Sequence, residues 1–143
     1  MKTLLPVLSL ALLSLQPGIS HAGAVDPERA SFAQCGVGKR ITCVVDGDTF
    51  WYEGAKIRMA DINTPETSGP SCAAEAVLGA RATRRLTQLL NDGPFTLEVR
   101  GRETDRFGRA LRVVTRQGKS LGAILEAEGL AEYWKGRRSD WCA

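Results

Sequence analysis

Histidine is nearly absent from this chain of 143 residues, which contains only His21. His21 lies in the leader-like start of the chain, so the remainder has no histidine to serve as a general base or a metal ligand. A Ser-His-Asp triad is therefore excluded, and acid–base catalysis would have to use carboxylates, lysine, arginine or tyrosine. The four cysteines include no C-x-x-C pair, which disfavours a structural zinc site.

Long apolar runs are also scarce. The only one covers residues 4–15, follows Met1-Lys2, and is broken by Gln16-Pro17-Gly18. Small residues between positions 20 and 24 offer cleavage after Ala22 or Ala24, so residues 1–24 are predicted to be a secretory signal peptide. A membrane anchor is the alternative, but the run is too short to span a bilayer comfortably. We expect a secreted or periplasmic protein that has no membrane contact after cleavage.

The cysteines Cys35, Cys43, Cys72 and Cys142 are even in number. In a small exported domain this favours two disulfides over buried free thiols. Three connectivities are possible. We favour Cys35–Cys43, which closes a short loop, and Cys72–Cys142, which would tie the main helix to the C-terminus.

Charge is nearly balanced, with a net value of +3, and no polycationic tail is present. Arginines nevertheless gather in three places, at residues 81–85, 100–112 and 137–138. Arginine favours planar, bidentate contact with phosphate. A solvated surface is the alternative, and it is the better interpretation for most of these arginines.

Residue patterns predict short strands at 40–45, 49–52 and 56–62, joined by turns at 46–48 and 53–54. A loop follows at 64–71. Helical spacing then appears at Leu78, Ala82, Leu86, Leu89 and Leu90, with Ser71 as the expected N-cap and residues 91–94 as the end. Strands at 95–100 and 111–115 and a short helix at 120–128 complete the pattern.

This order of elements predicts an α+β fold that is mainly β. The expected architecture is a five-stranded OB-fold barrel with a helix between strands three and four and a short C-terminal helix. Residues 40–143 would form the folded domain. Residues 25–39 are polar with weak periodicity, and we expect a loosely structured leader held by Cys35.

Four short motifs carry the chemistry. Acidic oxygens, two arginines and a further carboxylate are the groups that metal-assisted phosphodiester cleavage needs. Alone, each motif also has a structural explanation, such as an ordinary turn or a loop glutamate. The motifs are Asp46-Gly47-Asp48-Thr49, Ile57-Arg58, Asn63-Thr64-Pro65-Glu66 and Asp105-Arg106-Phe107-Gly108-Arg109.

In this order and spacing, the four motifs resemble the staphylococcal nuclease family, over roughly Arg40 to Trp134. The resemblance implies the same barrel fold and an endonuclease that acts on DNA and RNA, leaving a 3′-phosphate and a 5′-hydroxyl. It also implies catalytic roles for Glu66, with the attacking water, and for Arg58 and Arg109, on the phosphate. Asp48, the side chain of Asn63 and the carbonyl of Thr64 would bind Ca²⁺.

The chain departs from the family where Asn63 replaces an aspartate, which removes one charge and should weaken calcium binding. Asp61 could bind the calcium ion through a water molecule or be simply solvated. Asp46 could add negative charge just outside the ligands of the ion. Mg²⁺ or Mn²⁺ is the alternative ion.

In the expected nucleotide groove, Phe107 stands where the type member of the family has tyrosine. Arg106, Phe107 and Tyr133 are the residues that we expect to bind nucleic acid, with the aromatic rings stacking on bases.

We expect a monomer. The main alternative to a nuclease is an OB-fold module that binds single-stranded nucleic acid but cuts weakly or not at all, and the loss of charge at Asn63 motivates it. An Asn63→Asp variant with unchanged calcium affinity and rate would show that residue 63 is not a ligand. A third hypothesis, a protein- or peptide-binding domain, predicts no affinity for nucleic acid at moderate salt.

Overall fold

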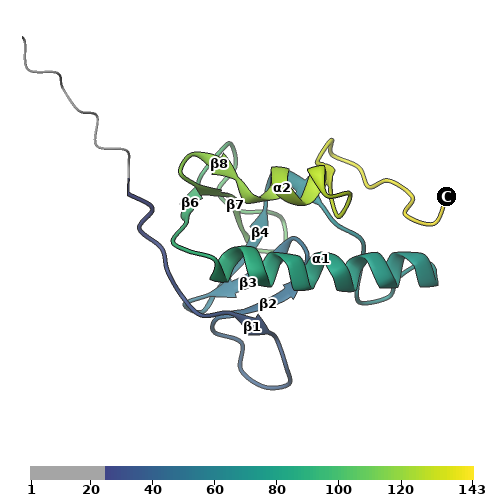
Figure 1. Cartoon of the computed structure of the whole chain (residues 1–143), viewed down its shortest axis with the longest axis horizontal. Coiled ribbons are helices and arrows are strands. Elements are labelled where there is room, and N and C mark those ends of the chain that lie inside the picture. Colours follow the sequence, from purple (N-terminus) through teal and green to yellow (C-terminus); the bar gives the residue numbers. More distant parts are fainter. Residues whose placement is uncertain (1–24) are drawn as a thin grey trace, which may run out of the picture.

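The computed structural model describes residues 25–143, so the predicted signal peptide lies outside the described residues (Figure 1). These residues form a mixed sheet in the order β1-β2-β3-β4-β7-β6, with β8 beside β7, and a small second sheet of β5 and β9. The elements are β1 (Ala33–Gln34), β2 (Cys43–Asp46), β3 (Thr49–Tyr52), β4 (Ala55–Met59), β5 (Ile62–Asn63), α1 (Ala73–Asn91), β6 (Thr96–Glu98), β7 (Ala110–Arg116), β8 (Lys119–Ser120), α2 (Leu121–Ala127) and β9 (Glu132–Tyr133).

The sheet is built from local hairpins and one long connection. β2, β3 and β4 pair antiparallel in succession, whereas β4 pairs parallel with β7 across the segment that contains α1. The strand predicted at 56–62 is interrupted, with β4 ending at Met59 and β5 starting at Ile62. The chain bends here around the Arg58 guanidinium, which donates to the carbonyls of both Met59 and Ile62. No ladder within residues 25–143 joins β6 to β2, so the closed five-stranded barrel stays a prediction.

The segment before β2 is integrated into the fold, unlike the loosely structured leader expected for residues 25–39. β1 pairs parallel with β2, and Glu28 forms an antiparallel bridge with Phe95 through two hydrogen bonds of 2.9 Å. Phe32 is only 5% exposed, and its ring packs against those of Phe50 and Phe95. This segment therefore supplies one edge strand of the sheet, β1 beside β2, and also contacts the chain at the start of β6, the strand at the other edge.

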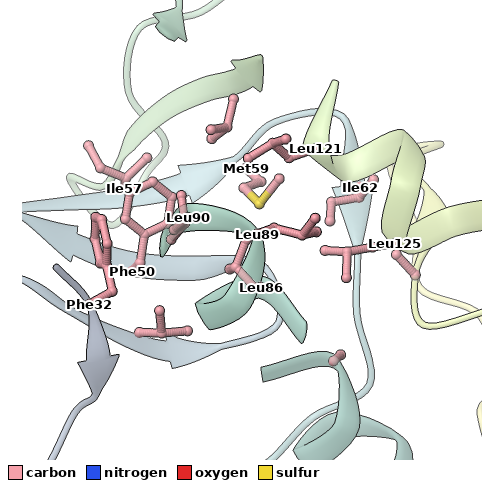
Figure 2. Packing of buried hydrophobic residues seen from close by; sticks show 14 of the residues in the cluster. Phe32, Phe50, Ile57, Met59, Ile62, Leu86, Leu89, Leu90, Leu121 and Leu125 are labelled. Carbon is pink, nitrogen blue, oxygen red and sulfur yellow. The ribbon is translucent and has the colours of Figure 1, made fainter. Parts of the chain in front are cut away.

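The helix α1 packs its apolar stripe against the sheet. Leu86, Leu89 and Leu90 meet Phe50 and Ile57 in the buried cluster (Figure 2). The N-cap is Cys72 instead of the expected Ser71, because the Cys72 sulfur accepts a hydrogen bond from the Glu75 N–H at 3.4 Å.

The second helix, α2, closes the other end of the core. Its buried side chains Leu121 and Leu125 belong to the same cluster as Met59 and Ile62 (Figure 2). Ser120 caps this helix by accepting from the Ala123 N–H. The core is therefore continuous from the N-terminal segment to α2.

Two disulfides are present, Cys35–Cys43 and Cys72–Cys142, which is the pairing that the sequence favours. The first closes an exposed loop ahead of β2. The second joins the start of α1 to the segment after β9. Among residues 25–143, no helix has the length and apolar character needed to cross a membrane.

The buried position of Phe32 generates a test of the N-terminal segment. Phe32→Ala should lower the free energy of unfolding by about 3–5 kcal/mol, because it removes a large side chain from the core. Urea denaturation would measure the loss. Val37→Ala in the same segment is the control, since Val37 is fully exposed and its change should stay within about 0.5 kcal/mol. Equal stability of the two variants would contradict the integration of this segment.

Candidate active site

The first motif forms the turn between β2 and β3. The Asp48 N–H donates to Asp46 Oδ1 at 3.1 Å, which closes the turn. A Cβ at Gly47 would lie 2.6 Å from the Cβ of Ala82, so only glycine lets the turn pack directly on α1. This close approach leaves Asp48 just 6% exposed.

Asp48 is the point at which three of the motifs meet. Its Oδ2 accepts from the Thr64 N–H at 2.9 Å and pairs with Arg58 Nη2 at 3.2 Å, while Oδ1 accepts from the Thr49 hydroxyl at 2.9 Å. Arg58 is also buried, and its Nη1 donates to the carbonyls of Met59 and Ile62. The structure thus brings Asp48, Arg58 and Thr64 into direct contact.

The oxygens near this cluster are of the kind that calcium binds. Asn63 is 1% exposed and directly precedes Thr64, so its amide, the Thr64 carbonyl and the Asp48 carboxylate form a set of hard donors. In the described part of the chain, no group of three or more His, Cys, Asp or Glu side chains could hold a metal ion. An ion here would therefore depend on amide, main-chain and water oxygens as well as Asp48.

Two further aspartates, Asp46 and Asp61, lie beside these residues in different environments. Burial, together with the negative charges of Asp48 and Glu66, raises the pKa of Asp46 to about 7. A bound cation would relieve that repulsion. Asp61 is not the solvated side chain considered from the sequence, because its Oδ2 accepts from the Ser120 hydroxyl at 2.5 Å and its Oδ1 is buried.

The loop that carries Glu66 is held by α1. A Cβ at Gly79 would lie 2.8 Å from the Glu66 carbonyl oxygen, so the helix and this loop are in backbone contact. The buried Glu75 accepts from the N–H groups of Ser71, at 2.6 Å, and Glu66, at 3.2 Å. The Glu66 carboxylate itself is half-buried and forms an ion pair with Arg138, from the segment after β9.

The second arginine motif folds around Asp105. Its Oδ1 accepts from the N–H groups of Phe107 and Arg109, and its Oδ2 pairs with Arg109 Nε at 2.6 Å. Burial opposes ionisation of Asp105, but these hydrogen bonds outweigh it and lower the pKa of the carboxyl group. Because Asp105 holds only Nε, the terminal nitrogens of Arg109 have no hydrogen-bond partner within residues 25–143. Arg106 and Arg109 both lie over the exposed ring of Phe107.

A cleft of about 650 Å³ brings Arg58 together with the 105–109 motif, whereas Asp48, Asn63, Thr64 and Glu66 do not line it. Its single carboxylate is Asp105, and Phe107 and Trp134 add aromatic surface. This balance favours a ligand with several negative charges and flat groups. Six arginines line the cleft: Arg58, Arg100, Arg102, Arg106, Arg109 and Arg138.

Tyr133, expected from the sequence to bind nucleic acid, does not line this cleft. It lies on β9 and is 57% exposed, whereas the next residue, Trp134, lies in the cleft wall with Arg58 Cζ 5.9 Å from its ring centroid. Successive side chains of an extended segment point to opposite sides, which explains why one faces the cleft and the other does not.

Comparison with known proteins agrees with this geometry. Residues 56–141 match the model of the family described as staphylococcal nuclease homologue. The chain belongs to the staphylococcal nuclease family. This confirms the family resemblance. The matched region contains Arg58, Glu66 and Arg109, and the motif at residues 46–49 lies before it.

Two relatives in Bacillus subtilis (strain 168) are named endonucleases. The chain is 38% identical over 92 residues to Endonuclease YncB, covering 61% of this chain and 43% of the relative. It is 39% identical over 92 residues to SPbeta prophage-derived endonuclease YokF, covering 61% of this chain and 31% of the relative. The chain therefore spans less than half the length of these curated relatives.

Within this member of the nuclease family, several site residues were not singled out by the sequence. Arg100, Arg102 and Arg138 belong to arginine clusters that look like ordinary solvated surface until the fold places them on one cleft. Glu132 carries no motif at all, yet its carboxylate accepts a hydrogen bond from the Asn63 side chain at 2.8 Å. Only contacts between residues far apart in the sequence show that these positions belong to the site.

The hydrogen bonds at Glu75 generate a pH-dependent prediction. The N–H groups of Ser71 and Glu66 lower the pKa of Glu75 below its ordinary value of 4.5. Its contribution to stability is therefore present above that ordinary value and is lost as the pH falls through the lowered one. Glu75→Gln should be less stable than the parent protein at neutral pH, and the difference should shrink in acid.

Urea midpoints measured across this pH range would test the role of Glu75. Glu126→Gln is the control, because Glu126 is exposed on α2 and makes no ion pair within the described residues. A constant gap between Glu75→Gln and the parent at every pH would contradict the prediction.

Proposed function

We propose that this protein is a calcium-dependent endonuclease that hydrolyses phosphodiester bonds in DNA and RNA. The observation that carries the proposal is the cleft lined by both Arg58 and Arg109, which Arg58 joins to the Asp48–Thr64 cluster and Arg138 joins to the carboxylate of Glu66. Membership of the family and the names of the two relatives support the same reaction.

Asp48, the Asn63 amide oxygen and the Thr64 carbonyl would hold the metal ion. Calcium is the best fit because it accepts mixed oxygen ligands and several waters, although Mg²⁺ or Mn²⁺ could occupy a related site. A bound ion would polarise the scissile phosphate and favour attack by water. Asp46 would contribute negative charge next to these ligands.

Arg58 and Arg109 would stabilise the extra negative charge of five-coordinate phosphorus. Arg58 is fixed by Asp48 and by two carbonyls, so its orientation needs little adjustment when substrate binds. Arg109 is fixed through Nε by Asp105, and its terminal nitrogens are available to phosphate oxygens. Both arginines are therefore arranged before the charge develops, which is the condition for effective electrostatic catalysis.

Glu66 would orient and deprotonate the attacking water. Its backbone is fixed by Glu75 and by the close contact with Gly79, which limits where the carboxylate can lie. Arg138 pairs with this carboxylate and also lines the cleft. A phosphate group would compete for Arg138 and leave Glu66 to interact with water.

The remaining cleft residues would bind the strand on either side of the cleaved bond. Phe107 and Trp134 would stack on bases without selecting a sequence. Arg100, Arg102 and Arg106 would contact neighbouring phosphates. Binding through stacking and phosphate contacts explains how one site could accept both DNA and RNA.

Export is part of the same proposal. Two disulfides are compatible with an extracellular or periplasmic protein, since such bonds persist in oxidising compartments. We place the domain outside the cytoplasm, as a monomer whose sheet forms a five-stranded OB-fold barrel. The predicted signal peptide would direct this export.

Removing either proposed catalytic group should stop the reaction. Glu66→Ala and Arg109→Ala are each expected to lower the rate of single-stranded DNA cleavage by about 100–1,000-fold, with unchanged urea unfolding curves. A calcium chelator should abolish cleavage by the parent protein. Arg40→Ala is the control, because Arg40 is exposed and does not line the cleft. Parental activity in either variant would refute the assignment, and tight binding without cleavage by the parent would favour the nucleic-acid-binding module.

Arg102 provides a separate test of strand binding. In a Glu66→Ala background, Arg102→Ala should weaken binding to single-stranded DNA and reduce the slope of log K against log salt by about 0.7, as expected for one lost phosphate contact. Fluorescence anisotropy at several salt concentrations would measure the slope. Arg40→Ala in the same background should leave it unchanged. An unaltered slope for Arg102→Ala would remove this residue from the interface.

A further inference from the structure

Asn63 has an unusual partner for a residue proposed to bind a cation. It lies opposite Glu132 in the antiparallel pair of β5 and β9, and its Nδ2 donates to Glu132 Oε1 at 2.8 Å. Asn63 is 1% exposed and Glu132 is half-buried, so this contact is partly buried and lies next to Thr64 and the Asp48 cluster.

The chemistry of the two groups fixes the direction of the amide. An ionised carboxylate only accepts hydrogen bonds, so Asn63 has to turn its NH₂ group toward Glu132. Its carbonyl oxygen, Oδ1, must then point to another side of the residue. Within residues 25–143, Oδ1 accepts no hydrogen bond, which leaves it available to a ligand.

Glu132 is itself fixed from a second direction. Its Oε1 accepts from the Ser139 N–H at 2.9 Å, and its Oε2 accepts from the Ser139 hydroxyl. The carboxylate is therefore held between β5 and the segment that also carries Arg138. It keeps one negative charge beside Asn63, the position at which the family pattern would have had an aspartate.

We propose that Glu132 is a positioning residue for the cation site, which orients Asn63 Oδ1 toward the ion and supplies the negative charge that Asn63 lacks. The inference rests on the proposed function, because the cation site belongs to it. Asn63 and Glu132 then act as one unit in which the ligand is neutral and the charge lies one hydrogen bond behind it.

This arrangement changes the expected outcome of restoring aspartate at position 63. Asn63→Asp alone would place two carboxylates directly opposite each other, at the distance of the present hydrogen bond. Like charges in that position are destabilising. The substitution should therefore harm the protein unless Glu132 loses its charge at the same time.

The experiment compares four oxidised proteins: the parent, Glu132→Gln, Asn63→Asp and the double variant. Glutamine keeps an oxygen that can accept from Asn63 Nδ2 but removes the charge, so it separates charge from geometry. Calcium affinity is measured by titration calorimetry, and melting temperature is measured without metal. Glu126→Gln controls for the loss of one surface charge.

We expect Glu132→Gln to bind calcium about tenfold more weakly than the parent. Without metal it should melt only slightly lower than the parent, because the hydrogen bonds from Asn63 and Ser139 are weaker to an amide than to a carboxylate. Asn63→Asp should melt at a lower temperature without metal, and adding Glu132→Gln should restore it. The double variant should bind calcium at least as tightly as the parent, since the charge has then moved onto the ligand.

Each contrary result has a distinct meaning. Parental calcium affinity in Glu132→Gln, or a melting temperature of Asn63→Asp that Glu132→Gln does not restore, would overturn this inference and leave the proposed nuclease intact. A parent protein that cuts DNA without binding calcium would overturn both the calcium requirement and this inference. A parent that binds calcium but does not cut would refute only the proposed reaction, and the affinities of the variants would still decide the role of Glu132.

Discussion

The buried negative charge of Asp48 is the constraint on which the rest of the site depends. A carboxylate that is 6% exposed has to be compensated, and the Arg58 guanidinium and the Thr64 N–H do this. Removing one partner of a buried pair typically costs about 3–5 kcal/mol, because the other charge is left without compensation. The turn after β2, the strand β4 and the loop after β5 are therefore held together by the same groups that would perform the chemistry. Stability and function are not separable at this point of the fold.

The electrostatics of the site divide into two neighbouring regions. Burial and the neighbouring carboxylates of Asp48 and Glu66 raise the pKa of Asp46, whereas the charged groups of the adjoining cleft are six guanidinium groups and one carboxylate. Both regions are neutralised only when a cation binds beside the carboxylates and a polyanion binds beside the arginines. A single phosphate would neutralise only part of the cleft, so the charge distribution favours a strand with several phosphates over a small phosphorylated molecule.

Local chemistry explains which features were predictable from the sequence. The hairpin of β3 and β4 and the apolar stripe of α1 follow from patterns within short segments, and three of the four motifs contain the residues that meet at Asp48. The disulfide pairing was one of three that the sequence left open, and Cys72–Cys142 joins residues 70 positions apart. The attachment of the N-terminal segment is not predictable from its polar composition, because it depends on the buried Phe32 and on main-chain pairing with β2 and Phe95. Cys72 is not a common helix cap, so Ser71 was the natural expectation. Glu132 and Arg138 acquire their roles only through contacts with residues far away in the chain, and no local pattern encodes such pairing.

The contact of the N-terminal segment with β2 and with the start of β6 has a consequence for folding. The hairpins formed by β2, β3 and β4 need only neighbouring residues, and they can assemble as soon as those residues are available. Glu28 is made early, but its partner Phe95 follows only after the whole of α1. Closing so large a loop is entropically costly and slows folding relative to proteins with local contacts. We therefore expect the first part of the described chain to reach its final position late in folding, after the hairpins.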